Sequence, residues 1–252
     1  MLKKYTGGVI AALLVVGVSG QAVAEKKMME TNIGDFSANV SLYSDYIYRG
    51  ISQTFEEPAI QGGADWSHDS GFYAGVWASN VDFNDGDQAH IEIDVYAGYG
   101  GSIGNFGYDI GVLQYLYPGA SSSQNYDFWE VTPAISYDFG VASVGASVSY
   151  TPDNFGGSDE AFFYQATVEA PLPMGFTLSA NIGRWNIKDN ATFALPDYTT
   201  WGVGLSYGLG SLHSKLDAFT VGVDYTDTNI DRTVCGSNNC DGRAVFNISA
   251  SF

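Results

Sequence analysis

Residues 200–209 read TWGVGLSYGL, and this stretch alternates strictly between two kinds of side chain. The odd positions from Trp201 to Leu209 are all apolar, whereas the even positions are Thr, Gly or Ser. Alternate side chains of a β-strand point to opposite faces, so this strand has one continuously apolar face and one polar or small face. The pattern predicts a strand that separates an apolar environment from a polar interior.

Twelve segments with this alternation account for nearly all of the chain after residue 35. Each has a length close to the roughly 9–11 residues that a tilted strand needs to cross a bilayer. We expect strands at about 36–48, 59–68, 72–82, 90–99, 106–116, 127–137, 141–150, 161–170, 176–185, 199–209, 217–227 and 244–252.

The connections between these segments alternate in length. Short ones, such as 68–71 and 138–140, are followed by longer ones, such as 151–160 and 228–243. Short periplasmic turns and longer outer loops are typical of an up-and-down membrane barrel, so we expect both termini in the periplasm. Pro133 lies inside the sixth segment and cannot donate a ladder hydrogen bond, so we expect a bulge or irregular pairing there.

A sheet that crosses a membrane must close on itself, because lipid offers no partner for the backbone groups of a free edge. Aromatic side chains also gather near the segment ends, as interfacial girdles require. These aromatics are Trp66, Phe72, Tyr99, Phe106, Trp129, Tyr137, Tyr150, Phe176, Trp201, Tyr207 and Tyr225. The alternative is a periplasmic β-sandwich or lipocalin-like barrel, but such a protein would carry more surface charge than these segments do.

Composition agrees with a single all-β domain. The 252 residues include 31 Gly, 17 Tyr, 15 Phe and 5 Trp, which favour short strands over helices. Ten Lys and Arg stand against 28 Asp and Glu, for a net charge of -18. Nucleic-acid binding requires a basic face, so it is excluded as a function.

Both ends of the chain carry targeting signals. Lys3 and Lys4 precede a short apolar run and the Ala-Val-Ala of residues 22–24, which predicts a secretory signal peptide at 1–24 with cleavage between Ala24 and Glu25. Residues 25–35 would form a short periplasmic segment, and 36–252 the barrel. The chain ends AVFNISASF, and its terminal Phe252 resembles the signal read by the barrel assembly machinery of the outer membrane. We therefore expect export to the outer membrane of a Gram-negative bacterium, with periplasmic chaperones and the assembly machinery as partners.

Cys235 and Cys240 lie in the last and longest loop. In an oxidising compartment, two cysteines separated by four residues around Gly and Asn predict a disulfide that tightens the loop tip. A metal site is the alternative, but Asp231 and Asp241 are the nearby acids and further ligands would be needed.

Motifs for catalysis are missing from the sequence. It contains no Gly-x-Ser-x-Gly, no His-Glu-x-x-His and no glycine-rich phosphate loop, and we expect neither an enzyme nor a cofactor. The run His68-Asp69-Ser70-Gly71 invites comparison with an outer-membrane phospholipase, but we interpret it as a hairpin turn on the periplasmic side.

Acidic side chains dominate the face that the strand register turns inward. The candidates for lining the lumen are Asp45, Arg49, Asp65, Glu92, Asp94, Asp109, Glu130, Glu169 and Asp224. A hydrated lumen of this kind would prefer cations. The alternative is that the carboxylates bond to Tyr, Ser and Thr and plug the barrel. Asp45 and Arg49 would lie about 13 Å apart on one strand, so we expect Arg49 to pair with an acid on a neighbouring strand, such as Asp65, and to anchor a constriction or loop.

The N-terminal third carries a recognisable pattern. Residues 43–54 read YSDYIYRGISQT, residues 58–63 read PAIQGG, and residues 70–81 read SGFYAGVWASNV. Together they resemble the TorF family of proteobacterial porin-like proteins, long described as conserved proteins of unknown function. The resemblance extends over the whole mature chain and implies an outer-membrane location and a porin-like role. It supplies no catalytic residues and no substrate.

The sequence as a whole predicts a twelve-stranded outer-membrane barrel that passes small hydrophilic solutes and prefers cations. The alternative is a closed structural or surface-binding barrel, whose acidic loops would face a partner or the divalent ions that bridge lipopolysaccharide. A lipid-modifying enzyme is a third and weaker hypothesis.

Overall fold

The computed structural model describes residues 29–31 and 33–252. The expected signal peptide at 1–24 and its cleavage site at Ala24 and Glu25 lie outside the described residues. The part of the 25–35 segment that is described begins with β1 (Met29–Thr31), which pairs with the start of the following strand.

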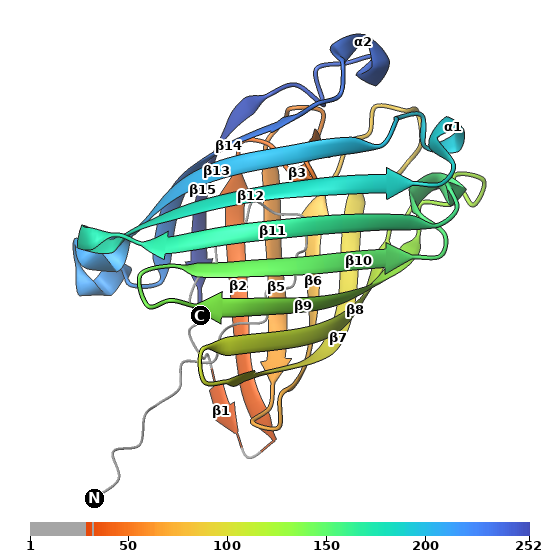
Figure 1. The fold of residues 1–252 in the computed structure, drawn as a ribbon. Helices are drawn as coiled ribbons and strands as arrows, with labels where there is room; N and C mark the ends of the chain where they lie inside the picture. The colour runs from red at the N-terminus through yellow and green to blue at the C-terminus, as the bar shows by residue number, and fades with distance from the viewer. Residues whose placement is uncertain (1–28, 32) are drawn as a thin grey trace, which may run out of the picture.

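Twelve antiparallel strands form one closed barrel (Figure 1). Each strand pairs with the next along the chain, and the last pairs with the first, so every one of the twelve has two neighbours. The strands are β2 (Gly34–Tyr43), β5 (Ala59–Ser67), β6 (Phe72–Asn80), β7 (Ile91–Ile103), β8 (Phe106–Leu116), β9 (Phe128–Asp138), β10 (Ser143–Thr151), β11 (Ala161–Pro171), β12 (Phe176–Ile187), β13 (Tyr198–Gly208), β14 (Phe219–Thr228) and β15 (Arg243–Ser251). The predicted fold class is confirmed.

The remaining elements are short and lie in the connections. β3 (Ile47–Tyr48) and β4 (Ile51–Ser52) form a small hairpin between β2 and β5. The others are α1 (Asn190–Phe193), α2 (Arg232–Cys235), η1 (Phe155–Gly157), η2 (Pro173–Gly175), η3 (Leu209–Ser211) and η4 (Ser214–Leu216). Within the described ranges, no helix is both long and apolar enough to span a membrane.

The two ends of the barrel differ, and we name them by their connections. The turn end carries residues 68–71, 104–105, 139–142, 172–175 and 209–218, together with β1 and the C-terminus. The loop end carries residues 44–58, 81–90, 117–127, 152–160, 188–197 and 229–242, including α1 and α2 (Figure 1). Short and long connections alternate as the sequence predicts, except that the turn-end connection 209–218 is as long as the loop-end connections 81–90 and 188–197.

The outer wall of the barrel is apolar. Side chains such as Val95, 45% exposed, and Val203, 48% exposed, project from the middle of their strands, whereas their sequence neighbours are less exposed. Phe72, Trp129 and Trp201 are exposed near strand ends. A continuous exposed apolar band with aromatic borders is the surface that a barrel presents to lipid.

The first wall strand is shorter than predicted. β2 ends at Tyr43, and after Ser44 the chain leaves the wall, so the prediction of a strand to residue 48 is wrong at its end. Asp45 and Arg49 consequently lie in the β2–β5 connection and not on one wall strand. Arg49 and Gly50 have φ angles of 49° and 86°, which produce a two-residue hairpin turn in place of a continued strand.

Pro133 interrupts pairing without a bulge. β8 and β9 keep one register through the pair of Ile110 and Pro133. On the other side, pairing of β9 with β10 stops after Ala134 and resumes in the same register at Val131. The Thr132 hydroxyl bridges the gap by donating to Ser149 Oγ at 2.8 Å. The expected irregular pairing is present, but no extra residue is inserted.

Candidate functional site

The interior of the barrel is filled unevenly. Along β12, the inward residues Gly183, Trp185 and Ile187 are buried at the loop end, whereas Ser179 and Asn181 are half-buried toward the turn end. The same change from buried to half-buried runs along β10 and β11. The half of the barrel nearest the loops is therefore packed, and the half nearest the turns is more accessible.

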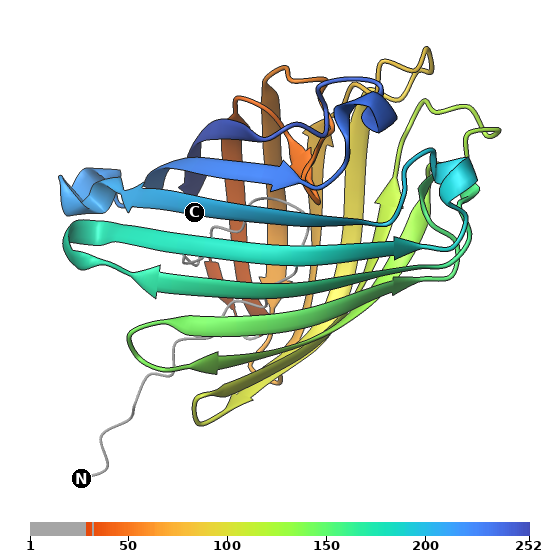
Figure 2. The ribbon, with the colours of Figure 1, turned by 45° about the horizontal axis from the view of Figure 1, so that its top comes forward.

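Segment 44–58, with the β3–β4 hairpin, fills the loop half. It lies within the ring of strands near the end that carries α1 and α2 (Figures 1 and 2). Tyr46 is 1% exposed and Arg49 is 5% exposed, although both belong to a connection. A positive φ costs an Arg residue roughly 1–2 kcal/mol relative to Gly, so the contacts of its side chain must offset that cost.

Arg49 stands at the tip of the hairpin and is held from several sides. Its Nη2 donates to both carboxylate oxygens of Glu130 on β9, at 2.8 and 2.7 Å. The guanidinium lies 4.7, 4.3 and 4.5 Å from the ring centres of Tyr48, Phe163 and Trp185. Burial lowers the pKa of Arg49, but Glu130, Tyr48 and Tyr115 together raise it by more, so the side chain stays charged. Arg49 therefore joins the hairpin to β9, β11 and β12.

Tyrosine hydroxyls attach the hairpin to the wall at further points. Each donates to a carboxylate, a carbonyl or another hydroxyl inside the packed half, so the hairpin is tied to the wall by buried hydrogen bonds. The bonds run from Tyr46 to Glu92 at 2.9 Å, from Tyr48 to Tyr115 at 3.2 Å, from Tyr115 to Glu130 at 3.1 Å, and from Tyr198 to the Arg49 carbonyl at 3.0 Å.

The connection 229–242 closes over the hairpin from the loop end. Arg243, the first residue of β15, donates to Asp45 at 2.8 Å and lies 3.4 Å from the Glu56 carboxylate. The backbone N–H of Ser52 donates to the Asn239 carbonyl at 3.0 Å. The hairpin is thus bound to the barrel wall on its inner side and to connection 229–242 on the side of the loop end.

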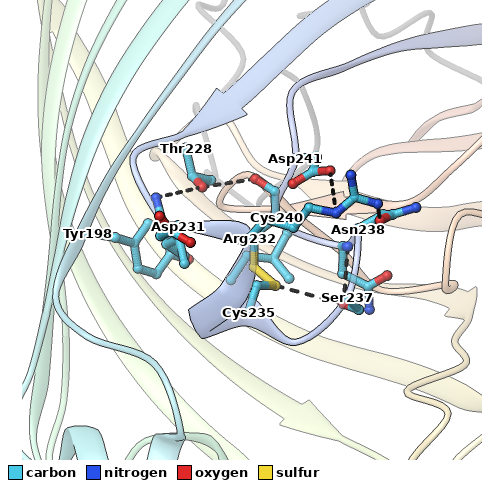
Figure 3. Close-up of a disulfide and its surroundings, with 12 residues drawn as sticks. Tyr198, Thr228, Asp231, Arg232, Cys235, Ser237, Asn238, Cys240 and Asp241 are labelled. Atoms are coloured by element: carbon cyan, nitrogen blue, oxygen red, sulfur yellow. Dashed lines mark hydrogen bonds and ion pairs between the residues drawn. A yellow bond between two sulfur atoms is a disulfide. The ribbon is translucent and has the colours of Figure 1, made fainter.

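A disulfide between Cys235 and Cys240 braces that connection (Figure 3). The Cα atoms of the pair are 6.2 Å apart, and Thr228 Oγ1 donates to the Cys240 carbonyl at 3.0 Å. Arg232 pairs with Asp241 at 3.4 Å. Among residues 29–31 and 33–252, no group of three or more His, Cys, Asp and Glu is placed to hold a metal ion, so the alternative of a metal site in this loop gains no support.

The candidate lumen acids fall into two groups. Asp45, Glu92, Asp94, Glu130 and Asp224 are almost fully buried, whereas Asp65, Asp109 and Glu169 are half-buried. The hydrogen bonds given to them include Tyr96 to Asp65, Tyr73 to Asp109 at 3.0 Å, and Asn247 to Asp224 at 2.9 Å.

The prediction that Arg49 pairs with an acid on a neighbouring strand, such as Asp65, is wrong. Glu130 lies on β9, far around the wall from β2, and Asp65 accepts from Tyr96 instead. The hairpin turn carries Arg49 inward across the barrel, which brings it to the far wall.

Several residues of the site were missed by the sequence reasoning. Phe163, Trp185 and Tyr198 surround Arg49, and Arg243 holds Asp45. The inward register of the segments at 161–170 and 176–185 was the signal that could have shown Phe163 and Trp185. Aromatic residues near strand ends suit the lipid boundary as well as the interior, so the aromatic pattern alone does not predict these contacts.

Gly50 tests how tightly the hairpin fits. A Cβ atom here would lie 2.4 Å from Thr200 Oγ1 and 2.6 Å from Thr228 Cγ2, on two wall strands. We expect Gly50→Ala to destabilise the folded barrel by about 1–3 kcal/mol, measured by urea titration in detergent, because neither the wall nor the positive φ accommodates the methyl group. Gly86→Ala is the matched control, since Gly86 has a similar φ of 83° and nothing within 4 Å of its Cβ position. Equal losses in both variants would show that the hairpin is not tightly packed.

A closed antiparallel barrel with an apolar outer band, a polar interior and an inward-folded loop has the architecture of the bacterial porins. Solved porin structures share this fold. The KdgM porin has a TM-score of 0.57 at 10% identity, over 86% of this chain and 99% of that one. The NanC porin has a TM-score of 0.56 at 14% identity, over 86% and 98%. KdgM in complex with disordered oligogalacturonate matches similarly, with a TM-score of 0.56 at 9% identity.

Residues 30–252 match the family described as "Bacterial protein of unknown function (Gcw_chp)", and the chain belongs to that family. A search of the curated proteins finds no match.

Proposed function

We propose that this protein is an outer-membrane channel for the passive diffusion of small hydrophilic solutes, with a preference for cations. The loop end would face outward and both termini the periplasm, as in porin barrels. The resemblance to the TorF family supports this role. The C-terminal strand β15, together with the Phe252 that follows it, would be read by the barrel assembly machinery during insertion.

The observation that carries the cation preference is the charge of the interior. Five acids are buried there, and two arginines reach the same region. Both arginines form ion pairs with carboxylates, Arg49 with Glu130 and Arg243 with Asp45. Fixed negative charge between low-dielectric walls concentrates cations and repels anions.

This charge argues for a different solute from the one named with KdgM. Oligogalacturonate carries a carboxylate on every sugar, so it is a polyanion at neutral pH. An acidic lumen would repel such a chain, and the packed loop half would hinder a polymer. We therefore propose small cations and small neutral solutes as the cargo.

Single-channel recording in planar bilayers tests the proposal. We expect small discrete conductance steps, because segment 44–58 narrows the loop half, and a reversal potential of cation-selective sign across a KCl gradient. An anion-selective reversal potential would contradict the cation preference.

One observation favours a second candidate, a closed structural or surface-binding barrel. The packed loop half is held by a continuous network of hydrogen bonds, which is what a plug would require. The outer loops are acidic, and a hydrogen bond from the Glu160 backbone, together with Lys188, lowers the pKa of Asp159. Such carboxylates would face the divalent ions that bridge lipopolysaccharide. Well-folded protein that conducts no measurable current in the bilayer would favour this candidate.

A further inference from the structure

The turn end of the barrel carries large exposed apolar side chains on one side. Four successive turns join β7 to β8, β9 to β10, β11 to β12 and β13 to β14, so they are neighbours around the wall (Figure 2). Each has at least one large apolar side chain in it or beside it that is between 61% and 78% exposed. We call these side chains the apolar turn rim, which consists of Ile103, Phe139, Val141, Met174 and Leu212.

The other connections differ from these four turns. The fifth turn, residues 68–71 between β5 and β6, reads HDSG and contains no apolar side chain. At the loop end, the large exposed apolar residues of the described connections are Phe55 and Val234, which are 40% and 50% exposed. The apolar turn rim is therefore confined to one sector of one end. An exposed apolar surface of this kind marks a contact with lipid or with another protein.

Continuity with the outer wall favours lipid as the contact. The Phe139 ring packs against the ring of Tyr137, an outward residue of β9, with 4.7 Å between the ring centres. Ile103 pairs across its hairpin with Phe106, which is exposed on the outer wall. The rim thus extends the apolar band that a barrel presents to the membrane.

The backbone of these turns suits the membrane surface. The Phe139 N–H donates to the Ala142 carbonyl at 2.9 Å, and the Leu172 N–H donates to the Phe176 carbonyl at 2.8 Å. Such bonds matter because lipid offers no partner to a free peptide group. Met174 has a φ of 68°, a conformation that favours glycine, so an exposed methionine is placed here at a cost in backbone energy.

A single basic side chain accompanies the rim. Among the five turn-end connections, all of which lie in the described part of the chain, Lys215 is the only Lys or Arg. It belongs to the same connection as Leu212, and both side chains are exposed. A lysine beside exposed leucines offers a cation and an apolar surface together, which matches the phosphate and the acyl chains of a phospholipid.

We propose that the apolar turn rim is embedded in the headgroup region of the phospholipid leaflet, with Lys215 beside a lipid phosphate. The barrel then tilts, because this sector lies deeper in the lipid than the polar turn at residues 68–71, which stays in water. In the orientation proposed above, this leaflet is the periplasmic one. The anchoring requires no conduction, so it goes beyond the proposed function and holds equally for a closed barrel.

Spin labels on single introduced cysteines test the depth of each turn. The variants Val141→Cys, Met174→Cys and Asp69→Cys are labelled with the Cys235–Cys240 disulfide oxidised and refolded into vesicles of phosphatidylcholine and phosphatidylglycerol. Oxygen concentrates in lipid, whereas a nickel chelate on both sides of the bilayer stays in water. We expect the ratio of oxygen to chelate contact to be several-fold higher for the labels at positions 141 and 174 than for the label at position 69, the matched control.

Two results would overturn the proposal. If the labels at positions 141 and 174 meet the chelate as often as the label at position 69 does, the rim stands in water. If they are shielded from both oxygen and the chelate, a second copy of the chain covers the rim in place of lipid.

A label introduced by Leu212→Cys tests the role of Lys215. Adding Lys215→Glu should raise the contact of this label with the chelate several-fold in vesicles that contain phosphatidylglycerol, because the acidic side chain is repelled by the lipid phosphates. Lys215→Arg is the matched control and should leave the contact unchanged, since it keeps the charge. Equal contact in all three proteins would refute the pairing of Lys215 with a phosphate.

Discussion

Arg49→Met should raise single-channel conductance several-fold, because Arg49 holds the β3–β4 hairpin inside the barrel. Its guanidinium binds Glu130 and lies against three aromatic rings, and both charged side chains are almost fully buried. Met keeps much of the apolar length but removes every charged contact. The hairpin should then spend more time out of the packed half, which widens the path.

The same substitution should destabilise the folded barrel. Removing one partner of a buried ion pair leaves the other charge uncompensated, at a cost of roughly 3–5 kcal/mol. Urea titration in detergent, together with the heat-induced shift of the folded band on gels, measures this loss.

A double variant separates the charge from the anchor. Arg49→Met combined with Glu130→Gln removes both charges, so most of the lost stability should return. The hairpin would still lack its anchor, and conductance should stay high. A single variant with wild-type conductance and wild-type stability would show that Arg49 does not hold the hairpin.

The wall of the barrel could be predicted because its signal is local. Each strand alternates between lipid and interior, so a period of two in the sequence reports the environment of every residue. The predicted segments at 106–116 and 161–170 agree with β8 (Phe106–Leu116) and β11 (Ala161–Pro171) to within one residue. Closure followed from the bilayer, which forbids a free edge.

The inward hairpin could not be predicted in the same way. From Tyr43 to Tyr48 the sequence continues with residues that suit a strand, so the local pattern extends the wall. The contact that overrides it joins Arg49 to Glu130, 81 positions away in the sequence. Which acid faces Arg49 depends on how the barrel closes, and the sequence pattern of a single strand does not predict this closure.

For the interior acids, the sequence predicts that the side chains face inward, but it does not predict how deeply each is buried. Alternation placed Glu92 and Asp109 on the inward face, and both lie there. Glu92 is buried because segment 44–58 packs against it, with Tyr46 donating to its carboxylate, whereas Asp109 is half-buried. The burial of an inward residue therefore depends on a connection whose path the strand pattern does not contain.

Reduction of the Cys235–Cys240 disulfide should increase current fluctuations and conductance of the wild-type channel. The disulfide braces the connection that covers the hairpin (Figure 3). In this region Asn239 accepts from Ser52, and Arg243 pairs with Asp45. Closing so short a loop contributes roughly 2 kcal/mol by restricting the unfolded chain. Once the disulfide is reduced, connection 229–242 gains conformational freedom, and its contacts with the hairpin break more often. The contacts between the hairpin and the barrel wall remain.

The variant Cys235→Ser with Cys240→Ser provides the control. Its channels should resemble the reduced wild type, and the reductant should change them no further, which excludes an effect of the reductant on the membrane. Because Arg49 still anchors the hairpin from below, the rise in conductance should be smaller than in Arg49→Met. A reduced wild type with unchanged currents would mean that the connection 229–242 does not restrain the hairpin, and that the contacts within the packed half suffice to hold it.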